Sequence, residues 1–312
     1  RQIYLVQVTN DLPALVILLN STYFIALLMQ TALSPEEIAH LSAQLATPDP
    51  NIPQGEADDI QPARIEEAVA LFRDLVFPGF FTARPTLECL SQLSRILYRQ
   101  IEAARCVVGE TCCAKALTQQ FMQAIPALRN TLGLDVRAIY NGDPAAASHT
   151  EVILCYPSVQ AIVHYRMAHV LHRAGVPIVP RIISELAHAR TGIDIHPGAE
   201  IGPEFAIDHG TGVVIGATCI IGRGVRLYQG VTLGARNFKT AEDGTLLNLP
   251  RHPIIEDNVV IYSNASVLGR ITVGHDSIIG GNVWVTHAVP PHSRVLQSKV
   301  TLGTDFEKGA GI

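Results

Sequence analysis

Asp194 and His209, 15 residues apart, are side chains whose types and spacing suit general-base chemistry. An imidazole can remove the proton of a hydroxyl group as that hydroxyl acts as a nucleophile, and a nearby carboxylate can orient the ring. Asp194 begins the segment DIHP, and His209 lies in the segment DHGTG. Either residue alone would ordinarily be a solvated polar group on the surface. The pair can therefore act as a catalytic site only if the fold brings both side chains together.

An aliphatic residue recurs every six positions in the C-terminal part of the chain. A period of six fits neither an α-helix nor a half-exposed strand, but it is typical of a parallel β-helix, in which three hexads make one triangular coil of about 18 residues. The interval from Asp194 to His209 is just short of one coil, so we expect the two side chains to lie near each other on adjacent turns. The members of the series are Ile195, Ile201, Ile207, Val213, Cys219, Val225, Val231, Ile255, Ile261, Val267, Val273, Ile279 and Val285.

Residues 1–190 have the pattern of amphipathic helices. Apolar residues recur at spacings of three and four in 66–77, 87–104, 114–132 and 158–173, with Pro and Gly between these segments. Residues 236–253 interrupt the six-residue repeat with polar and helix-breaking residues, so we expect an extruded loop there. These patterns predict an α+β protein, with an all-helical domain at 1–190, a β-helix domain at 191–295 and a flexible tail at 296–312.

The composition indicates a folded protein that does not bind nucleic acid. Hydrophobic residues make up 48% of the 312 residues and charged residues 16%, which favours a packed core and buried contacts between subunits. A net charge of -5 without a long basic run leaves no electrostatic site for phosphates. The cysteines have no zinc-like spacing, so we expect reduced, buried thiols in a cytoplasmic protein. They are Cys89, Cys106, Cys112, Cys113, Cys155 and Cys219.

Residues 12–33 carry no charge over a length that could span a bilayer. Asn20, Ser21 and Thr22 lie near the centre of this segment, and no cluster of Lys or Arg flanks it. Neither an orientation in a membrane nor a signal peptide is therefore encoded. We expect a buried helical hairpin rather than a membrane span.

Five motifs resemble those of the serine O-acetyltransferase branch of the hexapeptide-repeat acyltransferases, over residues 143–291. They are GDPAA at 142–146, TGIDIHPGAEIG at 191–202, IDHGTGVVIG at 207–216, GVTLGA at 230–235 and RHP at 251–253. The resemblance implies a left-handed parallel β-helix that transfers the acetyl group of acetyl-CoA to the hydroxyl of L-serine, giving O-acetylserine for cysteine biosynthesis. It implies a dyad of His209 and Asp194, no acyl-enzyme, no permanently bound cofactor and no metal.

The resemblance also implies which residues bind the substrates. Asp143 and Asp208 would hold the ammonium group of serine, Arg251 its carboxylate and His252 its reacting end. A zwitterion needs both charges in one pocket, and the planar guanidinium of Arg pairs with a carboxylate through two hydrogen bonds. Acetyl-CoA would lie in a groove between subunits of a trimer or of a dimer of trimers. The residues that match this groove are Gly234, Ala235, Ser263, Ala265, Gly280 and Gly281.

The terminal residue Ile312 resembles the end of the tail with which this family docks into O-acetylserine sulfhydrylase, so that enzyme is an expected partner. A short disordered end is the simpler interpretation of the same residues. A membrane partner is not expected.

Three other functions use the same type of β-helix. A sugar O-acetyltransferase fits the repeat, but GDPAA and the helical N-terminal half favour serine. A γ-type carbonic anhydrase would bind zinc between subunits through histidines such as His196, His209, His252 or His275, whereas the proposed dyad needs no metal. A scaffold without catalytic activity would have no need of His209.

Overall fold

The structure is a computed structural model of the chain, and it describes residues 32–47, 49, 51, 59–110 and 113–297. The chain forms two compact units, Arg1–Gly55 and Glu56–Ile312. In the first unit, helix α2 (Pro35–Leu45) begins at a capping box, in which Ser34 and Glu37 each accept the backbone N–H of the other. Residues 12–31 of the predicted hairpin lie outside the described residues. Within the part of the chain that is described, no helix is both long and apolar enough to cross a bilayer.

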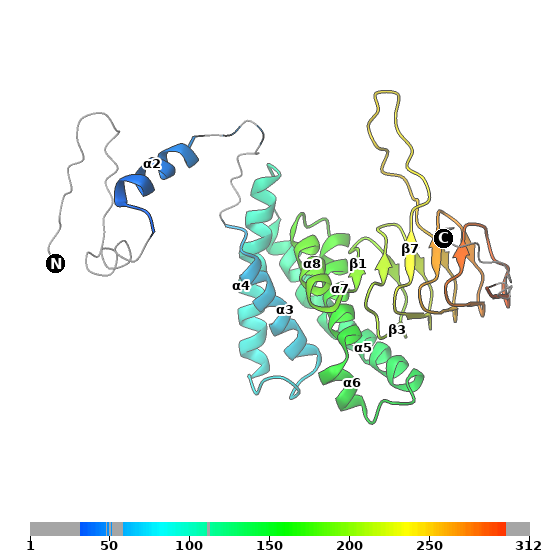
Figure 1. Cartoon of the computed structure of the whole chain (residues 1–312). Helices are drawn as coiled ribbons and strands as arrows, with labels where there is room; N and C mark the ends of the chain where they lie inside the picture. Colours follow the sequence, from blue (N-terminus) through cyan, green and yellow to red (C-terminus); the bar gives the residue numbers. More distant parts are fainter. Residues whose placement is uncertain (1–31, 48, 50, 52–58, 111–112, 298–312) are drawn as a thin grey trace. The chain divides into compact units, whose positions relative to one another are not determined.

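The second unit begins with a bundle of helices, which Figure 1 shows in cyan and green. The four predicted helices are confirmed. The third, which contains the exposed Pro126, ends at Gly142, ten residues later than predicted. Two further helices were not predicted. One of them starts within GVPIVP, because Pro180 occupies its first turn, where proline is favoured. The helices are α3 (Pro62–Val76), α4 (Thr86–Val107), α5 (Ala114–Gly142), α6 (His149–Cys155), α7 (Pro157–Arg173) and α8 (Val179–Thr191).

The strands that follow stack into three parallel sheets, which form the walls of a triangular β-helix. This arrangement confirms the predicted fold, a helical region followed by a left-handed parallel β-helix. We name its edges the AB, BC and CA corners, after the sheets that their turns connect. Sheet A contains β1 (Asp194–Ile195), β4 (Val214–Ile215), β7 (Thr232–Gly234), β10 (Ser266–Leu268) and β13 (Trp284–Val285); sheet B contains β2 (Glu200–Ile201), β5 (Ile220–Ile221), β8 (Ile254–Ile255) and β11 (Thr272–Val273); sheet C contains β3 (Ala206–Asp208), β6 (Arg226–Tyr228), β9 (Val260–Ile261), β12 (Ile278–Ile279) and β14 (Arg294–Val295).

The register of the strands differs from the predicted phase in the second coil. On all three walls the inward residue of a first-coil strand pairs with one 20 residues later, as Ile195 does with Ile215. The next step on the same wall, from Ile215 to Leu233, is 18 residues. Because the longer steps share the turn between β3 and β4, two extra residues lie in that turn. The predicted positions Val213, Cys219, Val225 and Val231 were therefore wrong by two: they are buried at corners, and the inward strand residues are Ile215, Ile221, Leu227 and Leu233.

The predicted extruded loop leaves the prism between β7 and β8, at the AB corner (Figure 1). Thr240 and Leu246 form an isolated antiparallel bridge in this loop. A surface excursion of this kind does not disturb the stacking, because Ile221 of β5 still pairs with Ile255 of β8 across the interruption.

A buried ion pair fastens the helices to the first coil. The guanidinium of Arg166 on α7 donates two hydrogen bonds to the carboxylate of Asp135 on α5, at 3.0 and 3.1 Å. It also donates to the carbonyl oxygens of Ile201 and Gly202, and Asp135 accepts the N–H of Phe205. The helices and the prism thus share one continuous hydrophobic core. A domain boundary at residue 190 remains a prediction, although the last helix ends at Thr191.

The prediction of buried thiols is only partly right. Cys89 and Cys219 are buried, whereas Cys106, Cys113 and Cys155 are exposed. Cys112 lies outside the described residues. The exposed cysteines stand at or near the ends of helices α4, α5 and α6, where side chains face solvent more readily than in a helix interior.

Candidate functional site

His209 stands on the two-residue insertion at the CA corner, directly after β3. Its backbone is left-handed, with φ of 57°, a conformation in which histidine is enriched among non-glycine residues. Its side chain is 77% exposed, so the imidazole points away from the interior of the prism. The next residue, Gly210, has φ of 91°, and a Cβ there would lie 2.5 Å from Ile193 Cδ1. The glycine lets the widened turn close against the first coil and leaves the imidazole free to meet a substrate.

Asp194 begins the coil that His209 ends, so the two residues share one coil instead of lying on adjacent turns. Asp194 is half-buried on the outer face of β1 and pairs with Val214. Its carboxylate lies within 4.8 Å of ligand atoms of Glu185 and His188 on α8. Among the residues that the structure describes, no hydrogen bond or ion pair joins Asp194 to His209. The dyad therefore remains a prediction.

Asp208 lies beside His209, and Asp143 lies within reach of the charge of His209. Asp208 Oδ1 is 3.8 Å from His209 Nε2. Asp143 caps the C-terminus of α5, accepts the N–H of Ala145 at 2.8 Å and accepts the hydroxyl of Tyr156 at 2.5 Å. The Tyr156 hydrogen bond, followed by that from Ala145, lowers the pKa of Asp143, and the charge of His209 acts in the same direction. The structure therefore brings Asp143, Asp208 and His209 into one acidic cluster.

Two members of this cluster were not predicted from the sequence. The hydrogen bond to Asp143 raises the pKa of Tyr156 to about 12, so its hydroxyl stays a donor. Arg226 on β6 donates to the carbonyl oxygen of Ala138 at 3.2 Å. Its guanidinium fills the space beside Gly142, where a Cβ would lie 1.5 Å from Arg226 Nη1. The sequence carries a weak sign of each residue: Tyr156 precedes the helix-starting Pro157, and Gly142 precedes the motif aspartate.

Arg251 and His252 lie at the AB corner, where the extruded loop rejoins the prism. The hydroxyl of Thr218 accepts the backbone N–H groups of both residues, at 2.9 and 3.1 Å. His252 Nδ1 in turn accepts from Thr218, which leaves Nε2 as the proton-bearing nitrogen of a neutral ring. His252 is 7% exposed, and burial, with the charges of Arg251 and Arg270, lowers its pKa to about 4. Gly216 makes room for the ring, because a Cβ there would lie 2.0 Å from His252 Cδ2.

His196 lies near the same corner. Its Nδ1 accepts the N–H of Gly198 at 2.9 Å, and its ring packs edge-to-face against that of His172. Burial is the main cause that lowers the pKa of His196 to about 4. The four histidines weighed for a zinc site are therefore divided among the three corners of the chain. His196 and His252 lie at AB, His209 at CA and His275 at BC.

The predicted acetyl-CoA residues are also divided between corners within one chain. Gly234 and Ala235 lie where β7 enters the extruded loop at the AB corner. Ser263, Ala265, Gly280 and Gly281 lie on stacked turns of the CA corner, where a Cβ on Gly281 would lie 3.2 Å from the carbonyl oxygen of Ser263. Ala265 is fully buried, so its methyl group fills the prism and only its backbone could contact a ligand.

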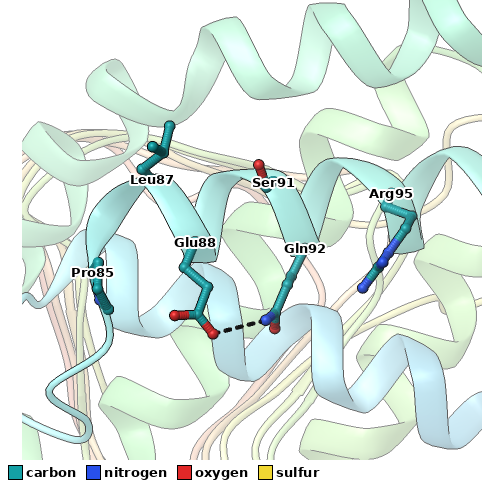
Figure 2. Close-up of a pocket in the computed structure, with 6 residues that line it drawn as sticks. All are labelled: Pro85, Leu87, Glu88, Ser91, Gln92 and Arg95. Carbon is teal, nitrogen blue, oxygen red and sulfur yellow. Dashed lines mark hydrogen bonds between the residues drawn. The ribbon is translucent and has the colours of Figure 1, made fainter.

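The surface of α4 carries a shallow hollow of about 580 Å³, shown in Figure 2. Its polar wall includes a hydrogen bond from Gln92 Nε2 to Glu88 Oε1, at 2.9 Å. None of the residues predicted for catalysis or substrate binding lines it, so it has no part in the chemistry considered above. Its lining residues are Pro85, Leu87, Glu88, Ser91, Gln92 and Arg95.

Comparisons with known proteins agree on one family. Residues 252–287 match the model of the bacterial transferase hexapeptide (six repeats) family. A relative from Synechococcus elongatus, named serine acetyltransferase, plasmid, is 54% identical over 200 residues, which are 64% of this chain and 62% of that protein. The serine acetyltransferase of Bacillus licheniformis is 47% identical over 162 residues, which are 52% of this chain and 71% of that protein.

Comparison with solved structures leads to the same family. The crystal structure of serine acetyltransferase isoform 3 from Entamoeba histolytica, in complex with cysteine, has a TM-score of 0.66 and 36% identity, covering 77% of this chain and 84% of that one. The chain spans less than two thirds of the length of two Synechococcus elongatus relatives, 62% and 65%.

Proposed function

The chain belongs to the serine acetyltransferase family, and from that premise we propose that it transfers the acetyl group of acetyl-CoA to the hydroxyl of L-serine. The product, O-acetylserine, serves cysteine biosynthesis. The observation that carries the proposal is the cluster at the CA corner, where an outward-facing His209 lies beside Asp208 and Asp143. An exposed imidazole next to two carboxylates suits a substrate that has both an ammonium group and a hydroxyl.

The proposed mechanism is direct attack. His209 removes the proton of the serine hydroxyl as its oxygen attacks the thioester carbonyl, and Asp194 orients the imidazole. When the carbon–sulfur bond breaks, the coenzyme A sulfur leaves and takes the proton from His209. The protein forms no covalent bond with the acetyl group, and acetyl-CoA is a co-substrate instead of a bound cofactor.

Recognition of serine uses both signs of charge. Asp143 and Asp208 bind the ammonium group, and the Tyr156 hydrogen bond keeps Asp143 ionised and fixes the direction of its carboxylate. Arg251 binds the substrate carboxylate, and His252 offers its Nε2–H to the reacting end. The Entamoeba histolytica relative crystallised with cysteine, which differs from serine by sulfur in place of the hydroxyl oxygen, and this supports an amino-acid site.

A second subunit completes the site. Arg251 and His252 lie at a different corner from His209, so we infer that the corner of one prism meets the neighbouring corner of another in a trimer. The acetyl-CoA residues are divided in the same way and would line the groove between the two prisms. A dimer of trimers, a cytoplasmic location and docking of Ile312 into a sulfhydrylase remain predictions, and Ile312 lies outside the described residues.

The experiment that tests the function is a thiol-release assay with acetyl-CoA and a panel of hydroxyl acceptors. We expect release of free coenzyme A with L-serine, weak release with L-threonine and none with glucosamine or galactosides. The acetylated product is identified by mass spectrometry as O-acetylserine. Preference for a sugar acceptor would overturn the proposal in favour of a sugar O-acetyltransferase.

A further inference from the structure

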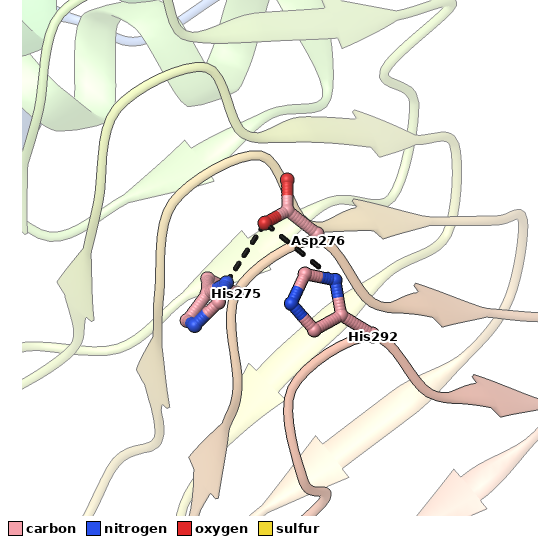
Figure 3. Close-up of side chains that lie close together, drawn as sticks. All are labelled: His275, Asp276 and His292. Atoms are coloured by element: carbon pink, nitrogen blue, oxygen red, sulfur yellow. Dashed lines mark hydrogen bonds and ion pairs between the residues drawn. The ribbon is translucent and has the colours of Figure 1, made fainter.

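The BC corner, which holds none of the residues proposed for catalysis or substrate binding, carries a group of side chains of metal-ligating types. His275 and Asp276 lie in the turn between β11 and β12, and His292 lies in the next turn, just before β14. One nitrogen of each ring and one carboxylate oxygen all lie within 4.8 Å of one another. Figure 3 shows both rings directed at the same carboxylate.

The backbone of the β-helix creates this arrangement. One residue in each turn of the BC corner has a left-handed backbone, and these residues stack above one another from coil to coil. Asn258, Asp276 and His292 occupy three successive levels, with φ of 58°, 56° and 57°. The N–H of His292 donates to the carbonyl oxygen of His275 at 2.9 Å, which fixes the spacing between the last two turns. The three side chains are therefore held together by the register of the coils.

The distances suit a small ion. His275 Nδ1 is 2.7 Å from Asp276 Oδ2, and His292 Nδ1 is 3.8 Å from the same oxygen. A tetrahedral ion with bonds of about 2.0–2.1 Å separates its ligand atoms by about 3.3 Å, and the two observed distances lie on either side of that value. Both rings are partly exposed, so small rotations can adjust the spacing and an ion has a path of entry.

The surrounding groups orient the ligands. Asn258 Nδ2 donates to Asp276 Oδ1 at 3.1 Å, which turns the other carboxylate oxygen toward the two histidines. Glu256 Oε2 accepts the backbone N–H of His275 at 2.9 Å. Hydrogen bonds to the ligands of a metal site commonly fix their direction in this way. The carboxylate of Glu256, which contacts the backbone of His275, also favours a cation at this corner.

We propose that His275, Asp276 and His292 bind one divalent transition-metal ion per chain at the BC corner. Two imidazoles and one carboxylate are borderline ligands that suit Zn²⁺ and its neighbours in the first row, and a water molecule completes the coordination. The ion stabilises the end of the β-helix, because it joins the last turn of the prism to the one before it. Of the histidines weighed for a carbonic anhydrase the site includes only His275, and all three of its ligands come from one chain, so it needs no second subunit.

The test uses the full chain without an affinity tag and Zn²⁺ alone as the probe. Equilibrium dialysis with metal analysis counts the bound zinc in the wild-type protein and in the variants Asp276→Asn and His292→Asn. Asn tolerates a left-handed backbone and already occupies the same column at Asn258, so both variants are expected to fold. We expect each variant to bind one zinc fewer per chain than the wild type.

Thermal unfolding provides a second measurement. At free Zn²⁺ one hundred times its Kd, the Tm of the wild type should rise by about 4–5 °C, and the shift should disappear in His292→Asn. The matched control is His188→Gln, which alters the cluster of Glu185, His188 and Asp194. This variant should still bind zinc at the BC corner and show the same rise in Tm. Equal zinc content in the wild type and both corner variants, or a Tm shift that survives His292→Asn, would overturn the proposal. Thiol release with serine should be unchanged in Asp276→Asn and His292→Asn.

Discussion

The hydroxyl of Tyr156 donates a hydrogen bond of 2.5 Å to Asp143 Oδ2, which joins the residue after α5 to the residue before α7, 13 positions along the chain. This contact raises the pKa of the tyrosine to about 12 and lowers the pKa of the aspartate. It fixes one oxygen of a partly exposed carboxylate that would otherwise rotate more freely. The second oxygen is held by the N–H of Ala145, so Asp143 presents a defined face to the cluster around His209.

Tyr156→Phe should weaken serine binding and leave the chemical step almost intact. Without the hydroxyl, Asp143 loses its orientation and becomes easier to protonate, so KM for serine should rise roughly three- to tenfold, while kcat changes less than twofold. Steady-state kinetics at saturating acetyl-CoA measure both constants. The control is Tyr140→Phe, whose ring stacks on His149 near the same helix end. A change in kcat alone would contradict the positioning role.

His209→Ala should lower kcat by roughly two to four powers of ten, the usual effect of losing a general base. The affinity for acetyl-CoA should change little, because in the proposed mechanism the imidazole acts on the serine hydroxyl. Turnover is measured by thiol release and acetyl-CoA binding by calorimetry. His287→Ala, on an exposed turn of the AB corner near the last coils, is the matched control. Near-normal turnover in His209→Ala would refute the assignment.

Arg251→Lys should raise KM for serine by roughly ten- to a hundredfold while the charge at the AB corner is preserved. A lysine ammonium group is a point charge and cannot reproduce the two parallel hydrogen bonds of a guanidinium to a carboxylate. Kinetics with serine measure the effect, and serinamide, which lacks the carboxylate, provides a second test. The variant and the wild type should use serinamide equally well. If the wild type used serinamide ten times better than Arg251→Lys does, Arg251 would act on a part of the substrate other than its carboxylate.

Asp135→Asn should lower the free energy of unfolding by about 3–5 kcal/mol, because it leaves the charge of Arg166 buried without a partner. Urea unfolding followed by circular dichroism measures the loss. Adding Arg166→Met to Asp135→Asn should recover part of it, since both buried charges are then removed. Asp243→Asn in the exposed loop should have little effect. If the double variant lost the sum of both single effects, the two side chains would not act as a pair.

The six-residue period predicted the β-helix because every wall needs an apolar residue at the same place in each coil. It could not predict the slip of two residues, because many turns also bury an apolar residue two positions before the strand residue. Val213 and Ile215 are both buried, so the pattern reads equally well in either phase. The slip affects the candidate site, because the two extra residues lie in the turn that carries His209.

The motifs located the parts of the site that are local in sequence and missed those that depend on packing. Asp208 and His209 are adjacent, and Asp143 follows the glycine that contacts Arg226. Tyr156 and Arg226 reach the cluster from a helix start and a strand, and the sequence gives only a weak sign that distinguishes them from surface residues. The placement of Arg251 and His252 at another corner also depends on the fold, because the loop before them interrupts the six-residue repeat from which a position on the prism could be read.

His164→Leu should remove part of the loss of stability that the protein suffers in mild acid. His164 is buried on α7, donates from Nδ1 to the carbonyl oxygen of Gln160 at 2.7 Å, and has no partner for Nε2 among the described residues. Burial, together with the charges of Arg190 and Arg73, lowers its pKa to about 4 from the ordinary 6.5. Between those two values the unfolded chain binds a proton that the folded protein does not, so stability rises with pH across this window and is constant above it.

The slope of the unfolding free energy from pH 4 to 6.5 should therefore decrease in the variant by up to about 1.4 kcal/mol per pH unit. Urea unfolding at half-unit pH steps measures it, with the exposed His188→Gln as the control. An unchanged slope would mean that His164 is protonated in the folded protein.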